Sequence, residues 1–387
     1  MSEYVAQVCT LDLNLNGGDC TSRFFGLLSN NLQENGPFFP NLYRLSFTIS
    51  YIPPDLDLSP LHRSPNLRIF TLTLYPGAVI NQKDLELFGK MISLFPPSLE
   101  YLVVMGGRTE LEPLSNGLSS FVLGCGSSLV QFKIPVPLSN EAILRLIKLP
   151  NLKIWATSQG PHKDVKSVPP SLKWFQIGSS EALGWIDILA PRHKVGKGQN
   201  NSAPARPHTT AGDNLESLEI GPGITVNSEL LYYLLPFRKL THLEVTGTCV
   251  EGICNFGWTD DNIRDLAAAL PCLQSLHLGF PCSSNTCKNT VASLVSISVN
   301  CSNLEDLRIH FNTKDIVSHM NRLIQEGTLD KRLKCNVVIK GLSVIPPRLK
   351  GTTDRINKKG KDCVAKGFRL IFPKLAEDII VLQTSRL

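Results

Sequence analysis

Residues 240–245 read LTHLEV and residues 273–278 read LQSLHL, two copies of the frame L-x-x-[apolar]-x-[apolar]. Ten copies of the frame open with Leu, one of which ends on the polar Thr157, and an eleventh opens with Val. The opening residues are Val8, Leu42, Leu67, Leu99, Leu129, Leu152, Leu172, Leu215, Leu240, Leu273 and Leu304. Their mean spacing of about 30 residues is typical of stacked structural repeats.

Each frame predicts one β-strand, because alternate residues of a strand share a face. The opening residue and the fourth and sixth residues are expected to face the core, and the second, third and fifth to face outward. Helical periodicity at residues 83–95, 139–149, 259–270 and 288–299 predicts crossover helices between parallel strands. The predicted fold class is therefore α/β, a leucine-rich-repeat solenoid with a curved parallel sheet on its concave side and helices on its convex side.

The repeats predict one solenoid of about eleven units over residues 1–345. Residues 191–214 are rich in Gly, Pro, Asn and Ser and contain four basic residues, which predicts a disordered basic insertion. Residues 346–387 are predicted to form a basic capping segment, because the last repeat of a stack must shield its core.

The composition excludes several classes of protein. Of 387 residues, 42% are hydrophobic and 19% charged, so disorder is not the dominant state. We find no signal peptide and no apolar run of about 18 residues, and thus expect no membrane partner. The 11 cysteines are expected to be reduced thiols of a cytoplasmic or nuclear protein. The basic C-terminal end lacks interleaved aromatic residues, which does not favour nucleic acid as a partner.

The sequence carries no phosphate-binding loop, dinucleotide fingerprint, nucleophile elbow or zinc-protease helix. We therefore expect neither catalysis nor a cofactor. The outward frame positions of the C-terminal half are mainly acidic and polar, which favours a Lys/Arg-bearing protein target on the concave face; plain solvation of a charged sheet is the alternative. The candidate binding residues are Glu216, Glu219, His242, Glu244, Gln274, His277, Glu305, Asp306 and Arg308. His242 and His277 are expected to lie near each other on this face, with two solvated surface histidines as the main expectation, because no oriented nucleophile for a catalytic histidine is evident.

Four cysteines recur at equal offsets in neighbouring repeats. Cys249 and Cys254 follow Leu240 by 9 and 14 residues, as Cys282 and Cys287 follow Leu273. Repeat kinship explains these offsets, and reduced structural thiols are the main expectation. A tetrahedral zinc site of four thiolates and redox disulfides are the alternatives.

Two segments resemble the leucine-rich-repeat region of fungal F-box proteins. They are GWTDDNIRDLAAALPCLQSLHLG from Gly257 and IHFNT from Ile309. That resemblance implies substrate recognition for a cullin-RING ubiquitin ligase, with an N-terminal F-box that docks the ligase adaptor. Residues 2–10 already lead into the first predicted strand and leave no room for an F-box. The adaptor is therefore expected as a partner only if an F-box lies upstream. A scaffold or inhibitor-like binder outside ubiquitination is the alternative.

Overall fold

A computed structural model describes the chain as two compact units, residues 1–173 and residues 174–387. The described residues are 7–15, 39–50, 64–75, 80–106, 111–179, 183–190, 214–221, 226–246, 249–250, 253–254, 256–279, 288–309, 341–344 and 380–382, with a few isolated positions.

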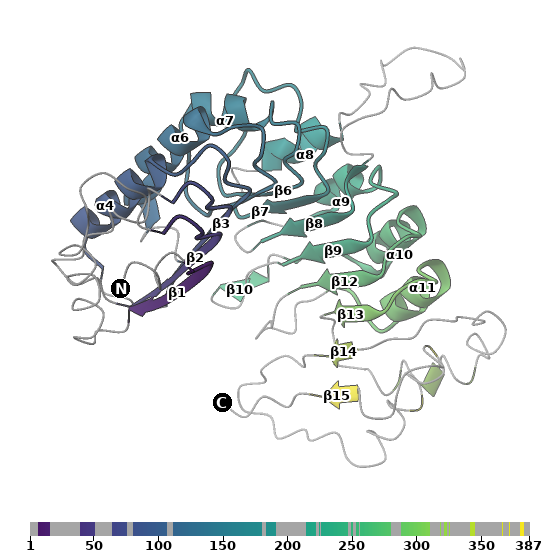
Figure 1. Cartoon of the computed structure of the whole chain (residues 1–387). Coiled ribbons are helices and arrows are strands. Elements are labelled where there is room, and N and C mark those ends of the chain that lie inside the picture. Colours follow the sequence, from purple (N-terminus) through teal and green to yellow (C-terminus); the bar gives the residue numbers. More distant parts are fainter. Residues whose placement is uncertain are drawn as a thin grey trace. The chain divides into compact units, whose positions relative to one another are not determined.

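The first unit contains a parallel sheet whose strands follow one another in chain order (Figure 1). The strands are β1 (Thr10–Leu15), β2 (Arg44–Ile49), β3 (Ile69–Leu74), β4 (Tyr101–Met105), β5 (Gln131–Lys133) and β6 (Ile154–Thr157). Equivalent frame positions lie side by side, as Leu45 beside Leu11 and Phe70 beside Leu45 show. The repeat in the sequence therefore sets the register of the sheet.

Helices cover the buried face of this sheet. They are α4 (Gln82–Ser93), α6 (Ser115–Gly124) and α7 (Asn140–Leu146), and a 3-10 helix, η1, spans Glu112–Leu114. Asn81 and Ser139 cap α4 and α7, because their side-chain oxygens accept backbone N–H groups of the first turn. Phe88 of α4 packs edge-on against Phe47 of β2, with ring centroids 5.5 Å apart, so the core lies between helices and sheet.

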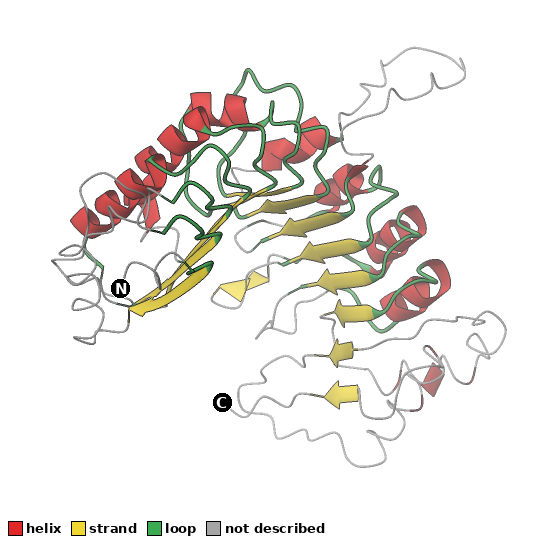
Figure 2. Cartoon of the chain, viewed as in Figure 1, coloured by secondary structure: helices red, strands yellow, loops and turns green. Residues whose placement is uncertain are grey.

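The second unit repeats the same plan (Figure 2). Its parallel strands are β7 (Trp174–Ile177), β8 (Ser217–Ile220), β9 (His242–Val245), β12 (Ser275–Leu278), β13 (Asp306–Ile309), β14 (Gly341–Val344) and β15 (Ile380–Leu382), in that spatial order. A separate antiparallel pair, β10 (Cys249–Val250) and β11 (Ile253–Cys254), follows β9.

The helices of the second unit are α8 (Gly184–Leu189), α9 (Ser228–Leu234), α10 (Asp260–Ala269) and α11 (Ala292–Asn300). A capping box begins α10, in which Thr259 and Asn262 satisfy each other's backbone N–H groups. Phe175 of β7 packs against Trp185 of α8 with ring centroids 6.0 Å apart. The helices of this unit thus cover the face of the sheet to which the buried frame residues point.

The predicted strands are confirmed for all eleven frames, and with them the predicted fold class. Leu240, Leu243 and Val245 are fully buried, whereas His242 and Glu244 between them are half-buried on the opposite face. We call the sheet face opposite the helices the open face; it corresponds to the predicted concave side.

The four predicted helices form as α4, α7, α10 and α11. Helices α6, α8 and α9 were not predicted from the sequence. The predicted insertion at 191–214 lies outside the described residues except for Asn214, and so does most of the predicted cap at 346–387. None of the helices in the described part of the chain has the length and apolar content that a bilayer span requires.

Candidate functional site

The open face of the second unit arranges the predicted binding residues in columns, because equivalent frame positions stack across parallel strands. The fifth frame positions form one column, in which Glu219 pairs with Glu244, Glu244 with His277 and His277 with Arg308. The third positions form a second column, in which His242 pairs with Ser217 and Ser275, and Ser275 pairs with Asp306.

The remaining predicted residues occupy the second frame position, one residue before each strand. Glu216, Gln274 and Glu305 are exposed there. Their strands lie in the order β8, β9, β12, β13. The carbonyl oxygen of Gln274 accepts the N–H of Glu305 at 2.7 Å. All nine candidates therefore lie on one surface; their role in binding a protein stays a prediction.

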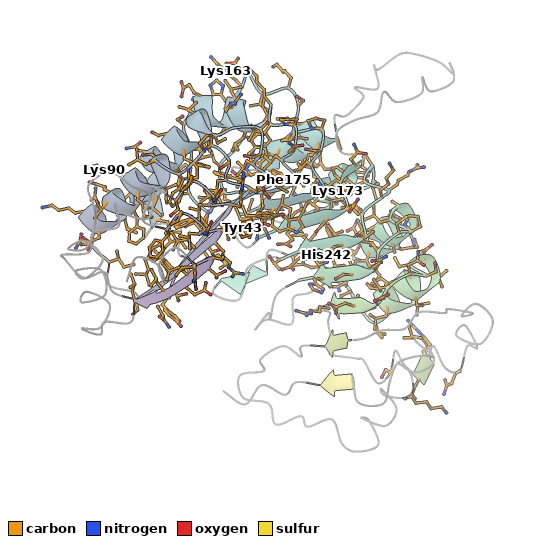
Figure 3. All side chains as sticks on the ribbon, in the orientation of Figure 1. Tyr43, Lys90, Lys163, Lys173, Phe175 and His242 are labelled. Atoms are coloured by element: carbon orange, nitrogen blue, oxygen red, sulfur yellow. The ribbon has the colours of Figure 1, made fainter. Side chains whose placement is uncertain are left out.

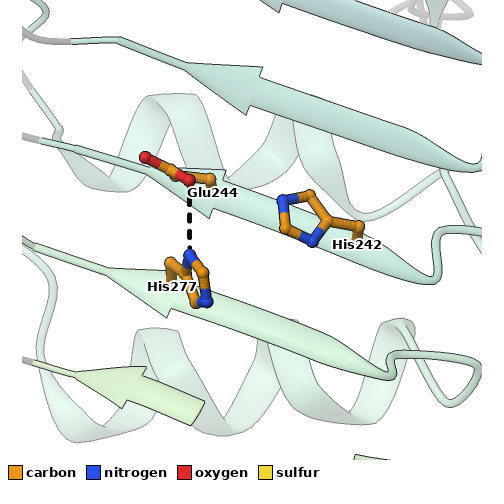
Figure 4. A group of neighbouring side chains, drawn as sticks. All are labelled: His242, Glu244 and His277. Atoms are coloured by element: carbon orange, nitrogen blue, oxygen red, sulfur yellow. Dashed lines mark hydrogen bonds and ion pairs between the residues drawn. The ribbon is translucent and has the colours of Figure 1, made fainter. Parts of the chain in front are cut away.

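Four of these residues form a compact group that we call the histidine cluster: His242, Glu244, His277 and Asp306. Nδ1 of His277 lies 3.3 Å from Oε2 of Glu244 (Figure 4). Nε2 of the same ring lies 2.8 Å from Oδ2 of Asp306. The ring of His242 meets that of His277 edge-on, with centroids 5.5 Å apart. Figure 3 marks His242 on strand β9 among the other side chains.

The cluster spans three strands and holds His277 at its centre. The His277 side chain is only 13% exposed, while those of Glu244 and Asp306 are 36% and 33% exposed. Oδ2 of Asp306 also lies 3.7 Å from the guanidinium of Arg308. A carboxylate on either side of one imidazole is an arrangement that stabilises positive charge at the ring.

The two histidines of the cluster have pKa values shifted in opposite directions. Burial alone lowers the pKa of His277, but hydrogen bonds to Glu244 and Asp306 and the charge of Asp306 outweigh it, so that pKa lies above its ordinary value. Burial, and then the charge of His277, hold the pKa of His242 below its ordinary value. The hydrogen bond from His277 lowers the pKa of Glu244, against the opposing effect of burial.

Ser275 is a member of the site that was not among the nine candidate residues. Its Oγ lies 3.3 Å from Nε2 of His277, whose Nδ1 faces Glu244, the order of groups in a Ser-His-acid triad. However, Asp306 lies closer to the same Nε2, at 2.8 Å. An imidazole whose Nε2 proton is held by a carboxylate has no lone pair there to accept a proton from serine, so the geometry disfavours nucleophilic catalysis.

Trp174 is a second residue of the site outside the nine candidates. Its indole Nε1–H donates to Oε1 of Glu219 at 3.0 Å, which fixes that carboxylate at one edge of the fifth-position column. A signal existed in the sequence, because Trp174 holds the third frame position of the preceding repeat and lies beside Ser217 in the sheet. Aligning the frames places an indole donor diagonal to Glu219.

The structure describes only two of the four cysteines that recur at equal offsets. Cys249 and Cys254 lie opposite each other as backbone partners of β10 and β11. Cys282 and Cys287 lie outside the described residues. The zinc and disulfide alternatives for these four thiols therefore stay predictions.

Searches with the sequence find no matching family model and no matching curated protein. Among solved structures, a chain of the crystal structure of the yeast Rad7 and Elc1 complex is similar at 18% identity and a TM-score of 0.44, over 82% of this chain and 74% of that one. A leucine-rich-repeat protein of Leptospira interrogans is similar at 13% identity and a TM-score of 0.28, over 97% of this chain and 96% of that one.

Proposed function

We propose that the chain is a protein-binding leucine-rich-repeat module whose open face in the second unit captures a segment rich in Lys and Arg. One observation supports this proposal most: five of the nine candidate residues on this face are carboxylates, and one is a guanidinium. The parallel strands hold these charges at a spacing of about 4.8 Å, so their negative potentials add up over this surface.

The charge pattern favours steering and selectivity over raw affinity. Half-exposed carboxylates attract basic partners at long range and repel acidic ones. Because the field of exposed charges is screened over about 8 Å at physiological salt, the proposed binding is expected to weaken as salt is added. The hydrogen bond from Trp174 holds the carboxylate of Glu219 in place, so this group offers a fixed contact for a cation of the partner.

A peptide array tests the proposal, with basic and acidic peptides of equal length and the full chain as probe. We expect binding of basic peptides, lost in the double variant Glu216→Lys with Glu305→Lys. Both residues are exposed and lie outside the histidine cluster. The matched control is Asp261→Lys with Asp265→Lys on α10, an equal charge change on the helix side. Equal loss in both variants, or none in the open-face variant, contradicts the proposed surface.

We further propose that the chain is not an enzyme. The position of Asp306 beside Nε2 of His277 supports this, since it removes the base that Ser275 requires. Incubation with activated acyl esters checks it: turnover that is abolished by Ser275→Ala and retained by Ser217→Ala would contradict the proposal.

At a finer level, we propose substrate recognition of the F-box type, on the resemblance carried by Gly257–Gly279 and Ile309–Thr313. The capping box at Thr259 and the buried Leu270 and Leu273 around the Pro271 exit agree with that family's pattern. Co-purification with a cullin-RING adaptor is the test. Target capture without adaptor binding favours the alternative, a scaffold or inhibitor-like binder.

A further inference from the structure

We propose that His242, Glu244 and His277 form a binding site for one divalent transition-metal ion of the zinc class on the open face of the second unit. Each residue offers one ligand atom, and the three atoms lie within 4.8 Å of one another. This assigns to the histidine cluster a ligand that the protein-binding proposal does not require.

The spacing of two of these atoms already suits coordination. Zinc binds imidazole nitrogen and carboxylate oxygen at about 2.0–2.2 Å, so two ligands of a tetrahedral ion lie about 3.4 Å apart. The distance from Nδ1 of His277 to Oε2 of Glu244 is 3.3 Å. The ligand atom of His242 lies within 4.8 Å of these two, so a modest rotation of its side chain brings it to the same tetrahedral spacing.

The hydrogen bond to Asp306 prepares His277 as a ligand. A carboxylate only accepts hydrogen bonds, so the 2.8 Å contact with Oδ2 of Asp306 places a proton on Nε2 of His277. In the neutral ring Nδ1 then carries a lone pair, which faces a carboxylate oxygen of Glu244. Two lone pairs at that distance repel each other unless a cation lies between them. Either a proton or a metal ion can be that cation.

Asp306 thus acts as a positioning residue. Metal-bound histidines commonly donate their second N–H to a carboxylate, which fixes the orientation of the ring and raises its basicity. Residues on three neighbouring strands, β9, β12 and β13, hold ligands and support together. The site is therefore built on rigid elements rather than on a loop.

The donor set selects the class of ion. Two imidazoles and one carboxylate suit Zn²⁺, Co²⁺ and Ni²⁺, whereas Mg²⁺ and Ca²⁺ prefer oxygen ligands alone. Three protein ligands leave one tetrahedral position open. A side chain of a bound partner can occupy that position.

Isothermal titration of the full chain with Zn²⁺ or Co²⁺ tests the proposal. We expect one ion per chain at the cluster, at least tenfold weaker binding in His242→Gln and in His277→Gln, and no change in Glu216→Gln, an open-face control. Unchanged far-ultraviolet circular dichroism without metal shows that each variant is folded, and the two glutamine variants serve as independent checks on each other. Wild-type affinity in both variants overturns the proposal, as does absence of binding.

The Co²⁺ spectrum separates this site from the cysteines. Imidazole and carboxylate ligands give visible d–d bands without the intense near-ultraviolet charge transfer of thiolate ligands. Asp306→Ala is expected to weaken binding about tenfold and to shift the d–d bands, which a purely structural role would not do. Thiolate charge transfer that disappears in Cys249→Ser with Cys254→Ser, with d–d bands unaffected by His277→Gln, overturns the proposal.

Discussion

Trp258 donates its indole N–H to the backbone carbonyl oxygen of Asn227 across 2.6 Å, and so ties one repeat to the next. Asn227 also caps α9, since its side-chain oxygen accepts the N–H of Leu230 at 3.0 Å. The backbone N–H of Gly257 donates to the carbonyl oxygen of Val226 at 2.7 Å. The fully buried indole therefore anchors the start of α10 to the start of α9.

Trp258→Phe is expected to lower the free energy of unfolding by about 1–3 kcal/mol, because it removes the indole donor and leaves a void beside the smaller ring. Urea unfolding followed by circular dichroism measures the change. Tyr232→Phe on α9, where the side chain is 65% exposed, serves as the control and should stay within about 0.5 kcal/mol of the wild type. Equal stability of the two variants would mean that this contact does not hold the repeats together.

Asp260→Asn is expected to cost about 2 kcal/mol of unfolding free energy, since hydrogen bonds to an ionised acceptor are stronger than neutral ones. The Asp260 carboxylate accepts the backbone N–H and the hydroxyl of Thr290, each at 2.7 Å, and the hydroxyl of Ser293. These bonds join the first turn of α10 to the start of α11.

The matched variant is Asp265→Asn in the same helix. Asp265 is half-exposed and, among the described residues, pairs with Arg264 alone, at 3.6 Å, so its loss should cost under about 0.5 kcal/mol. Thermal unfolding of both variants at one pH provides the comparison. The prediction fails if the two midpoints shift equally.

The repeat frame made the sheet predictable from the sequence. A leucine at the first frame position and apolar residues at the fourth and sixth specify a strand, its buried face and its partners, as the aligned Leu243, Leu276 and Leu307 show. Helix α10 was equally predictable, because Thr259 and two acidic residues mark its start. Helix α6 (SNGLSSFVLG) was not, since its serines and glycines are weak helix formers and tertiary packing decides its state.

The histidine cluster was predictable only in part. Stacked frames place His242 near His277, as expected, and place His277 beside Glu244. Frame position says nothing about rotamers, however, and the contact between Nε2 of His277 and Asp306 runs diagonally, between residues that are not register partners. The chemistry of the cluster depends on that diagonal contact, so the sequence alone could not reveal it.

Among the free thiols in the described part of the chain, Cys9 and Cys272 are expected to react with iodoacetamide well before Cys125 and Cys301. Cys9 and Cys272 are exposed, and the other two are buried. Burial raises the pKa of the Cys125 thiol to about 11, against the opposing charge of Arg145. The thiolate is the nucleophile, so below that pH the folded protein holds Cys125 in its unreactive form.

Peptide mapping after brief labelling at about pH 8 measures the order of reaction, and labelling in urea is the control in which all four should react alike. If Cys125 reacts as fast as Cys272 in the folded protein, its environment is more open than the structure indicates.

Helices α4 and α6 meet where Gly117 lies against the backbone of Gly89. This contact provides a test of the packing in the first unit. A Cβ on Gly117 would overlap the carbonyl group and Cα of Gly89, so backbone atoms would have to move. A Cβ on Gly89 would meet Cα of Leu114 at 3.6 Å and Cα of Gly117 at 3.7 Å, which is ordinary van der Waals contact.

The same Gly→Ala change is therefore expected to lower the stability of the protein at position 117 but not at position 89. Gly117→Ala should lower the free energy of unfolding by about 2 kcal/mol or more, because overpacking against backbone outweighs the gain in helix propensity. Gly89→Ala should be neutral or stabilise by up to about 1 kcal/mol, the propensity difference alone. Urea midpoints of the two variants decide the matter: if Gly89→Ala is the more destabilised of the two, the helices do not cross as described.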